Sequence, residues 1–104
     1  MSTTQVLKRC KRLLADHYGD AFKGLFIYGS HARKTATSES DIDLFVVLAA
    51  LTDYGAELKA LSSLLYDAQL DSKRLLSVKP VDQYSFDRGA LQLYRNAKKQ
   101  GHYL

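Results

Sequence analysis

The sequence predicts an α/β (α+β) fold in which helices pack against a three-stranded sheet. Apolar runs at 25–28, 41–48 and 74–81 indicate strands, and segments with helical spacing of apolar residues separate them. Both faces of the middle run are apolar and are formed by Ile42, Leu44, Val46 and Leu48 and by Phe45 and Val47. Such a strand belongs in the middle of a sheet covered by helices. The expected order is therefore helix, strand, short helix, strand, helix, strand, helix.

The first helix is expected from about Thr4 to His17. Ser2 and Gln5 have the spacing of a capping box ahead of it, and Gly19 is suited to end it. Its core-facing stripe is formed by Val6, Leu7, Cys10, Leu13, Leu14 and Tyr18. Cys10 on this stripe is expected to be a small packed residue and not a nucleophile.

Two longer helices and an edge strand are expected in the second half. Asp53 can cap a helix to about Leu70, whose inner stripe is formed by Tyr54, Leu58, Leu61, Leu65 and Ala68. The last helix is expected from near Ser85 to Gly101, with an inner face of Phe86, Ala90, Leu93, Tyr94 and Ala97. Between them, Pro80 cannot donate a ladder hydrogen bond, so its part of the strand belongs at a sheet edge or strand terminus.

Composition favours an ordinary soluble protein of one domain, residues 1–104. Hydrophobic residues make up 46% and charged residues 25% of the 104 residues, and no apolar run has the length of a membrane span. The N-terminus lacks the hydrophobic region of a signal peptide. Cys10 is the single cysteine, which excludes an internal disulfide and a zinc-binding thiol cluster. We therefore expect a cytoplasmic protein.

The net charge of +4 could suggest a nucleic-acid partner. The basic residues are instead spread over the first and last helices, where a solvated helix face explains most of them. Nucleic acid is therefore not expected as the primary partner, whereas an acidic partner or a nucleotide is compatible with these charges.

Candidate site residues are concentrated between 29 and 43. Gly29 permits a sharp turn and a close approach to its backbone. Ser30 can cap a short helix from His31 to about Lys34, whose free N–H groups would point toward an anion. Asp41 and Asp43 fall on one face of the next strand, about 7 Å apart. Two such carboxylates beside a phosphate-binding turn suit Mg²⁺ bound to a nucleoside triphosphate.

Gly-Ser, ten intervening residues and Asp-x-Asp resemble the signature of nucleotidyltransferases of the DNA polymerase β superfamily. Gly29, Ser30, Asp41 and Asp43 match it with the spacing intact, and the flanking Ala32-Arg33 resembles the minimal nucleotidyltransferase (MNT) branch. The resemblance implies a polymerase β-like fold with a mixed sheet. It also implies a partner, because minimal members pair with helical HEPN-domain proteins, often as antitoxin with toxin.

The resemblance implies transfer of a nucleoside monophosphate, most plausibly AMP from ATP, to a hydroxyl. Gly29 and Ser30 would hold the β- and γ-phosphates, and Asp41 and Asp43 would be the catalytic carboxylates that bind Mg²⁺. Two roles are open for Arg33, which could bind a phosphate or form a scaffold contact with Glu39 or a strand-end carbonyl.

Active members usually have a third carboxylate on the strand that corresponds to 74–81. Alignment by eye puts Leu75 at that place, and Asp71 and Asp82 flank the strand without being in register. Leu75 therefore weakens the expectation of full catalysis.

Three interpretations compete. The first is an active adenylyltransferase, and the second is a non-catalytic module that binds nucleotide and partner. The third is an aminoglycoside-type resistance enzyme, which needs more substrate-binding structure than 104 residues provide. For either of the first two, a HEPN-type protein or a second copy of the chain is the expected partner. It would dock on the last helix through Arg88, Arg95, Lys98, Lys99 and the tail His102–Leu104.

Overall fold

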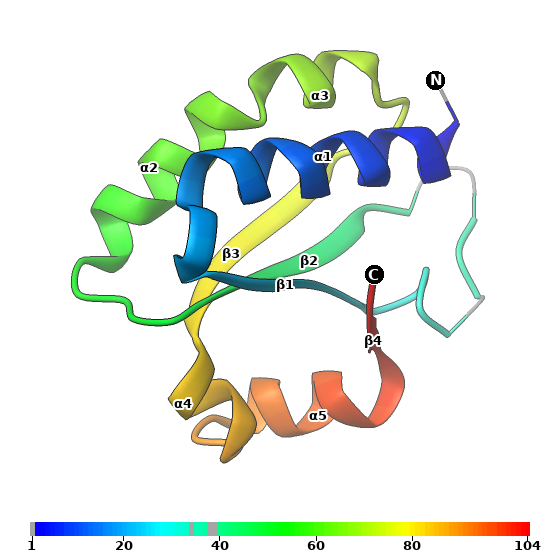
Figure 1. Cartoon of the computed structure of the whole chain (residues 1–104). Coiled ribbons are helices and arrows are strands. Elements are labelled where there is room, and N and C mark those ends of the chain that lie inside the picture. Colours follow the sequence, from blue (N-terminus) through cyan, green and yellow to red (C-terminus); the bar gives the residue numbers. More distant parts are fainter. Residues whose placement is uncertain (1, 34, 38–39) are drawn as a thin grey trace.

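The computed structural model describes residues 2–33, 35–37 and 40–104. A central sheet separates two layers of helices (Figure 1). The first layer contains α1 (Thr3–Tyr18), α2 (Tyr54–Leu64) and α3 (Tyr66–Asp71), and the second contains α4 (Gln83–Asp87) and α5 (Gln92–Gln100). A short 3₁₀ turn, η1 (Gly19–Ala21), joins α1 to the sheet. Within the described residues, every helix is too short or too polar to span a membrane.

The sheet is mixed and has the strand order β3-β2-β1-β4. The central pair, β1 (Phe22–Tyr28) and β2 (Ile42–Leu48), is antiparallel. β3 (Leu76–Asp82) runs parallel to β2, and β4 (His102–Tyr103) runs antiparallel to β1. The predicted fold class is confirmed, with one strand more than expected. Pro80 lies on the edge strand β3, as its missing donor required.

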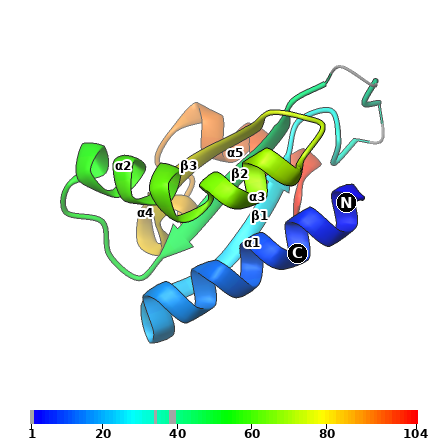
Figure 2. The ribbon, with the colours of Figure 1, turned by 90° about the horizontal axis from the view of Figure 1, so that it is seen from above.

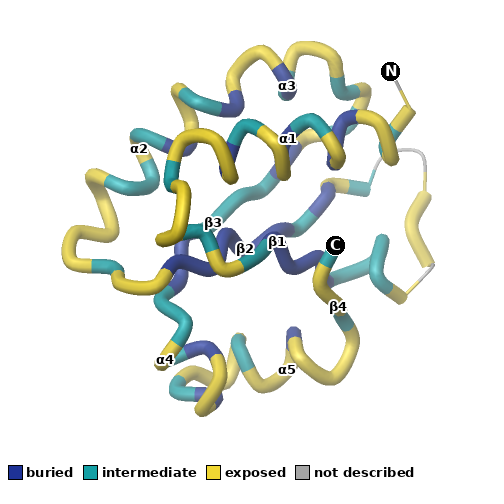
Figure 3. Tube along the Cα trace, viewed as in Figure 1, coloured by how far each residue is buried: buried dark blue, intermediate teal, exposed yellow. Residues whose placement is uncertain are grey.

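The core lies on both faces of the sheet, with residues of β2 in each of its two halves. Buried positions follow the central strands along the trace (Figure 3). On the side of α1, α2 and α3, the buried residues of the sheet are Leu25, Ile27, Ile42, Leu44, Val46, Leu48 and Leu76. On the side of α4 and α5, the buried residues are Phe26, Tyr28, Phe45, Val47, Val81, Phe86 and Ala97. The predicted burial of β2 on both faces is confirmed.

The first helix agrees closely with its prediction. Ser2 and Gln5 form the capping box, in which the Ser2 hydroxyl accepts from the Gln5 N–H at 3.2 Å. Gly19 follows α1 with a φ of 57°. Viewed from above, α1 crosses the sheet beside α3 (Figure 2). Cys10 on its inner face is fully buried, and burial raises the pKa of its thiol from 9.0 to about 11.

The helix predicted to run from Asp53 to about Leu70 is two helices, α2 and α3, divided at Leu65. Asp53 caps α2 as expected. One turn before the break, the Ser62 hydroxyl donates to the Leu58 carbonyl at 3.0 Å, a bond that commonly bends helices. Tyr54 was predicted to face the core and is 47% exposed, because it stands in the first turn beyond the sheet.

The last predicted helix, Ser85 to Gly101, is also divided. α4 ends at Asp87, and the chain turns at Gly89, whose φ of 65° lies in the left-handed region that interrupts a helix. Leu93, predicted on the inner face, is 42% exposed because α5 restarts the helical phase after this turn.

The tail is part of the sheet. Residues 102–103 form β4, and the Leu104 N–H donates to the Leu25 carbonyl at 2.8 Å. The ring of Tyr103 lies over Gly24, where a Cβ atom would be 2.7 Å from that ring. The tail His102–Leu104, expected to offer a docking surface with the last helix, is therefore held against the sheet, and the bare backbone of Gly24 explains why the Tyr103 ring can dock.

Candidate functional site

The chain leaves β1 in a tight turn. Gly29 has a φ of 76°, the Arg33 N–H donates to the Gly29 carbonyl at 3.1 Å, and the Thr35 N–H donates to the Ser30 carbonyl at 2.9 Å. The prediction of a short helix from His31 to about Lys34 is wrong for residues 31–33, which form a turn. The spacing of the backbone hydrogen bonds changes after one turn, so no helix continues. Lys34 lies outside the described residues. The amide groups of residues 30–32 precede the first bonded N–H, as at a helix N-terminus.

The acidic pair lies beside this turn. Asp43 is on β2, where it pairs with Tyr28 of β1 and Ser77 of β3, and Asp41 comes directly before the strand. Alternation along the strand gives both carboxylates the face that Phe45 shares, on the side of α4 and α5. Asp43 is half-buried and Asp41 is exposed.

Gly29 and Asp43 approach each other too closely for any other residue at position 29. A Cβ atom there would overlap the Asp43 Oδ2 atom and lie 3.2 Å from its Cγ atom. The positive φ independently disfavours a side chain. The turn at residues 29–33 and the pair Asp41 and Asp43 therefore form one site, which we call the cradle. Within it, the Gly29 backbone lies directly against the Asp43 carboxylate because no side chain separates them.

The pKa of Asp43 is raised, first by burial of its carboxyl group and then by the negative charge of Asp41. The charges of Lys79, His31 and Arg33 act in the opposite direction without reversing the shift. A divalent cation would relieve the repulsion between the two carboxylates, and their oxygen atoms suit a hard ion such as Mg²⁺. Among the described residues, no three His, Cys, Asp or Glu side chains form a ligand cluster. The remaining ligands of a cation here would come from substrate or water.

Two side chains hold the turn in place. The His31 Nε2 atom lies 3.4 Å from the Ser40 carbonyl oxygen, which connects the turn to the start of β2. The Arg33 Nη1 atom donates to the Gln100 Oε1 atom at 2.8 Å, which connects the turn to the end of α5. Glu39, one expected partner of Arg33, lies outside the described residues.

The third strand presents no carboxylate beside Asp43. The register pairs Asp43 with Ser77, and the Ile42 N–H donates to the Leu75 carbonyl at 2.8 Å. Leu75 comes before β3 and is 58% exposed. Neither flanking acid reaches the pair: Asp71 forms an ion pair with Arg9, and Asp82 caps α4 by accepting from the Ser85 N–H.

Lys79 is a site residue that sequence reasoning missed. It lies on β3 opposite Phe45, on the same face as the acidic pair, and its Nζ atom donates to the Tyr28 hydroxyl at 3.5 Å. Lys79 lies two and four residues after Ser77 and Leu75, so it shares their face of the strand. This spacing places Lys79 near the acidic pair only once the parallel register of β2 and β3 is known.

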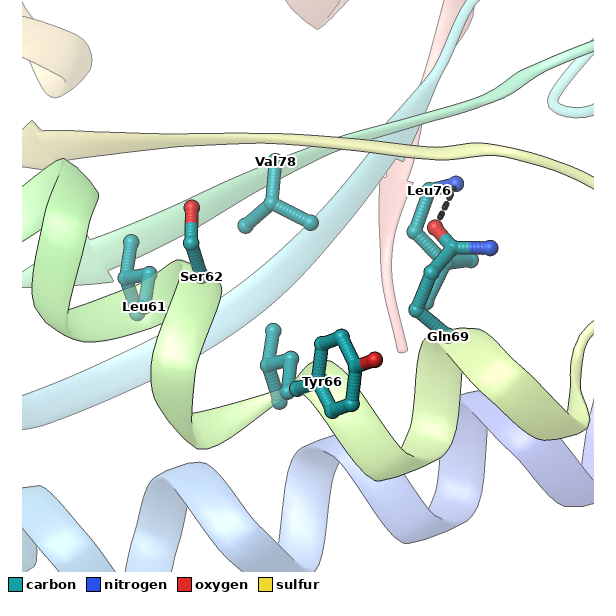
Figure 4. Close-up of a pocket in the computed structure, with 7 residues that line it drawn as sticks. Leu61, Ser62, Tyr66, Gln69, Leu76 and Val78 are labelled. Carbon is teal, nitrogen blue, oxygen red and sulfur yellow. Dashed lines mark hydrogen bonds between the residues drawn. The ribbon is translucent and has the colours of Figure 1, made fainter.

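A groove lies on the face of β3 opposite the acidic pair. It has a volume of about 250 Å³, and the residues lining it include Leu61, Tyr66, Gln69, Leu76 and Val78 (Figure 4). The Gln69 Oε1 atom accepts from the Leu76 N–H at 2.7 Å. Because Leu76 and Val78 alternate with Ser77, this groove and the acidic pair lie on opposite faces of the sheet.

A family model described as a nucleotidyltransferase domain matches residues 5–101, almost the whole chain. The chain belongs to the nucleotidyltransferase domain family. Among curated proteins, no significant match to the sequence was found. The resemblance drawn from Gly29, Ser30, Asp41 and Asp43 is confirmed for the family, while the role of each residue remains a prediction.

Solved toxin–antitoxin complexes contain chains with the same fold. One, a complex with AMP-PNP, has 24% identity over 98% of this chain and 72% of the other, with a TM-score of 0.60. A mutant MntA–HpeT complex has 22% identity over 99% and 72%, with a TM-score of 0.58. A tri-AMPylated Shewanella oneidensis HEPN toxin with its MNT antitoxin has 24% identity over 99% and 71%, with a TM-score of 0.55. The chain thus has the fold of chains found in these solved toxin–antitoxin complexes.

Proposed function

We propose that the chain binds ATP with Mg²⁺ and transfers AMP to a hydroxyl group of a helical, HEPN-type protein partner. The observation that carries this proposal is the cradle in which the Gly29 backbone meets the Asp43 carboxylate. A glycine turn whose amides at 30–32 have no hydrogen-bond partner among the described residues is suited to phosphate oxygens, and the adjacent acids are suited to the metal that accompanies a triphosphate.

Each residue of the cradle has a distinct task in this proposal. The amides of residues 30–32 and the Ser30 hydroxyl bind the β- and γ-phosphates, and Arg33 binds a phosphate oxygen after releasing Gln100. Asp41 and Asp43 hold Mg²⁺. When bound, this ion neutralises charge on the triphosphate and lowers the pKa of the attacking hydroxyl.

The reaction is an in-line displacement at the α-phosphorus. The acceptor hydroxyl loses its proton to water, and its oxygen forms a bond to the α-phosphorus. The bond from this phosphorus to the bridging oxygen breaks, and pyrophosphate leaves with the electron pair. The chain contributes position and charge, because phosphoryl transfer needs little covalent help from protein.

The chemistry and the related complexes support a protein partner. An acceptor oxygen must be held within about 3–3.5 Å of the α-phosphorus, which requires a binding surface, or wall, on the side opposite the triphosphate. A chain of the same fold occurs with AMP-PNP in a toxin–antitoxin complex, and another occurs with an AMPylated HEPN toxin. A HEPN-type protein that supplies both wall and hydroxyl is therefore our first candidate, and a second copy of this chain is the alternative.

A second candidate function is a non-catalytic module that binds nucleotide and sequesters the partner. One observation favours it: the site face of the third strand carries Leu75, Ser77 and Lys79, none of which is a carboxylate. The two functions share the cradle and differ in turnover.

One experiment separates them. The chain and a candidate HEPN partner are incubated with ATP labelled on the α-phosphate and Mg²⁺, alongside Asp43→Asn and the control Asp16→Asn, an exposed acid on α1. We expect label on the partner with the wild type and Asp16→Asn, and none with Asp43→Asn at an unchanged melting temperature. Mg²⁺-dependent ATP binding without label would favour the second candidate. Binding unaffected by Asp43→Asn or by removal of Mg²⁺ would contradict both.

A further inference from the structure

Lys79 extends its ammonium over the floor of the cradle. From its place opposite Phe45 on β2, the side chain reaches the Tyr28 hydroxyl on β1, 3.5 Å from its Nζ atom. The rings of Tyr28 and Phe45 are stacked at 4.2 Å and are both buried, which fixes the position of the Tyr28 hydroxyl. Among the charges that act on Asp43, that of Lys79 has the largest effect. The ammonium therefore lies beside the acidic pair.

This ammonium has unused hydrogen-bonding capacity. It carries three donors, and within the described part of the chain its single hydrogen bond is the long one to Tyr28. It forms no ion pair with a carboxylate of the described residues. Burial raises the pKa of Tyr28 to about 12, so its phenol stays neutral and does not form an ion pair with the ammonium. A half-buried cation in this state favours an anionic ligand.

The site's charge shows which ligand fits. Three carboxylates could hold two divalent cations, whereas Asp41, Asp43 and Lys79 have formal charges that sum to about −1, which the charge of Arg33 reduces further. That charge suits one divalent cation and a phosphate oxygen better than two divalent cations. Lys79 stands on the same strand face as Leu75 and Ser77, where the carboxylate is absent.

We propose that Lys79 is a phosphate-binding residue whose ammonium contacts a non-bridging oxygen of the α-phosphate, so that the site works with one Mg²⁺. This inference rests on the proposed function and deepens it by assigning the charge beside the reacting phosphorus. A lysine suits the place, because its compact charge on a flexible stem can follow the phosphate as the reaction proceeds.

Calorimetry with Mg²⁺ and ATP, AMP or adenosine tests the assignment. Lys79→Met should weaken the binding of ATP and AMP at least about tenfold and leave adenosine unchanged, because a charge-assisted hydrogen bond to phosphate is lost. Lys79→Arg should restore part of the affinity. Lys23→Met, an exposed lysine on β1, is the matched control and should bind all three ligands normally. Equal losses for adenosine and ATP would contradict phosphate contact.

A second measurement on the wild-type chain does not depend on the folding of a variant. Mn²⁺ titrated in the presence of the non-hydrolysable analogue AMP-PNP and followed by electron paramagnetic resonance should reach one bound ion per chain. Two ions per chain would overturn the inference. Asp43→Asn separates the two proposals: if it abolishes ATP binding while Lys79→Met changes nothing, only the role of Lys79 fails. If neither substitution matters, the proposed function fails too.

Discussion

Gly29 is the residue on which the geometry of the cradle most depends. Its positive φ directs the chain into the turn, and its missing side chain leaves room for the Asp43 carboxylate. Neither requirement concerns its own chemistry. The residue is needed because two other groups, a row of amides and a carboxylate, must lie close together.

Gly29→Ala should lower the free energy of unfolding by about 1–3 kcal/mol and abolish Mg²⁺-dependent ATP binding, since strain and a displaced Asp43 act together. Gly55→Ala is the matched control: it lies in the first turn of α2, and its new Cβ would have its nearest neighbour at 3.8 Å. We expect this control to be more stable by about 0.5–1 kcal/mol and to bind ATP normally. Urea unfolding and calorimetry measure both quantities. An alanine at 29 that binds ATP normally would show that the close approach is dispensable.

The buried thiol of Cys10 leads to a prediction about how stability depends on pH. Its pKa is raised from 9.0 to about 11 by burial, so the folded chain retains the thiol proton after the unfolded chain has lost it. Its contribution to stability is therefore complete well below pH 9 and falls as pH rises through 9 to 11, by at most about 2.7 kcal/mol. Cys10→Ala should lose less stability than the wild type between pH 8 and pH 10.5 in urea unfolding. Parallel losses would mean that the thiol does not titrate differently in the two states.

At the scale of elements, the outer edge of β3 is protected by two residues. In the parallel ladder, the backbone groups of Leu75 and Ser77 face β2. The backbone groups of residues 76, 78 and 80 therefore face away from β2, toward the open edge of the sheet. Gln69 accepts from the Leu76 N–H, and Pro80 has no N–H to offer. The edge is thereby less able to pair with another strand.

Gln69→Ala should lower the free energy of unfolding by about 1–3 kcal/mol, because the Leu76 N–H loses its partner and the Arg74 carbonyl keeps only the Ser72 hydroxyl as a donor. Gln92→Ala is the control: it also loses two hydrogen bonds, to Asn96 and Arg95, but these are between exposed side chains. Its effect should stay within about 0.5 kcal/mol. Similar values for the two variants would show that the edge is not held by Gln69.

Local patterns predicted the elements well and their interruptions poorly. The alternation from Ile42 to Leu48 required a buried central strand, and Ser2 with Gln5 required a helix start. The break at Leu65 follows a side-chain bond of Ser62, and the docking of Tyr103 depends on contact with Gly24, far away in the sequence. Such long-range contacts leave no periodic signal. For the same reason the sequence indicated Gly29, Ser30, Asp41 and Asp43 but not Lys79, whose role depends on register.

At the scale of the whole molecule, α5 offers a smaller docking surface than its charges suggest. The Arg95 Nη1 atom donates to the Gly89 carbonyl at 2.7 Å, and the Lys98 Nζ atom donates to the Asp87 carbonyl at 2.6 Å. Both cations thus stabilise the junction of α4 and α5. Lys99 is exposed beside them and is the better probe of a partner.

Lys99→Glu should weaken binding of an acidic partner surface about threefold or more at low salt, without changing the melting temperature. Lys98→Glu should lower the melting temperature as well. It removes the donor to the Asp87 carbonyl and places a negative carboxylate beside the carbonyl oxygens at the end of α4. Surface plasmon resonance and thermal unfolding separate the two effects. Unchanged affinity in Lys99→Glu would exclude this face of α5 as the docking surface.

The hydrogen bond between Arg33 and Gln100 has a thermodynamic consequence. Because the same guanidinium holds the end of α5 and is proposed to bind phosphate, occupancy of one site alters the other. Reciprocity then requires that ATP change the affinity for a partner on α5 by the factor by which the partner changes the affinity for ATP. We expect a factor of about two to ten, the size of one hydrogen bond. In Gln100→Ala this factor should approach one while each separate affinity remains measurable, so that a single side chain would account for the coupling between nucleotide and partner.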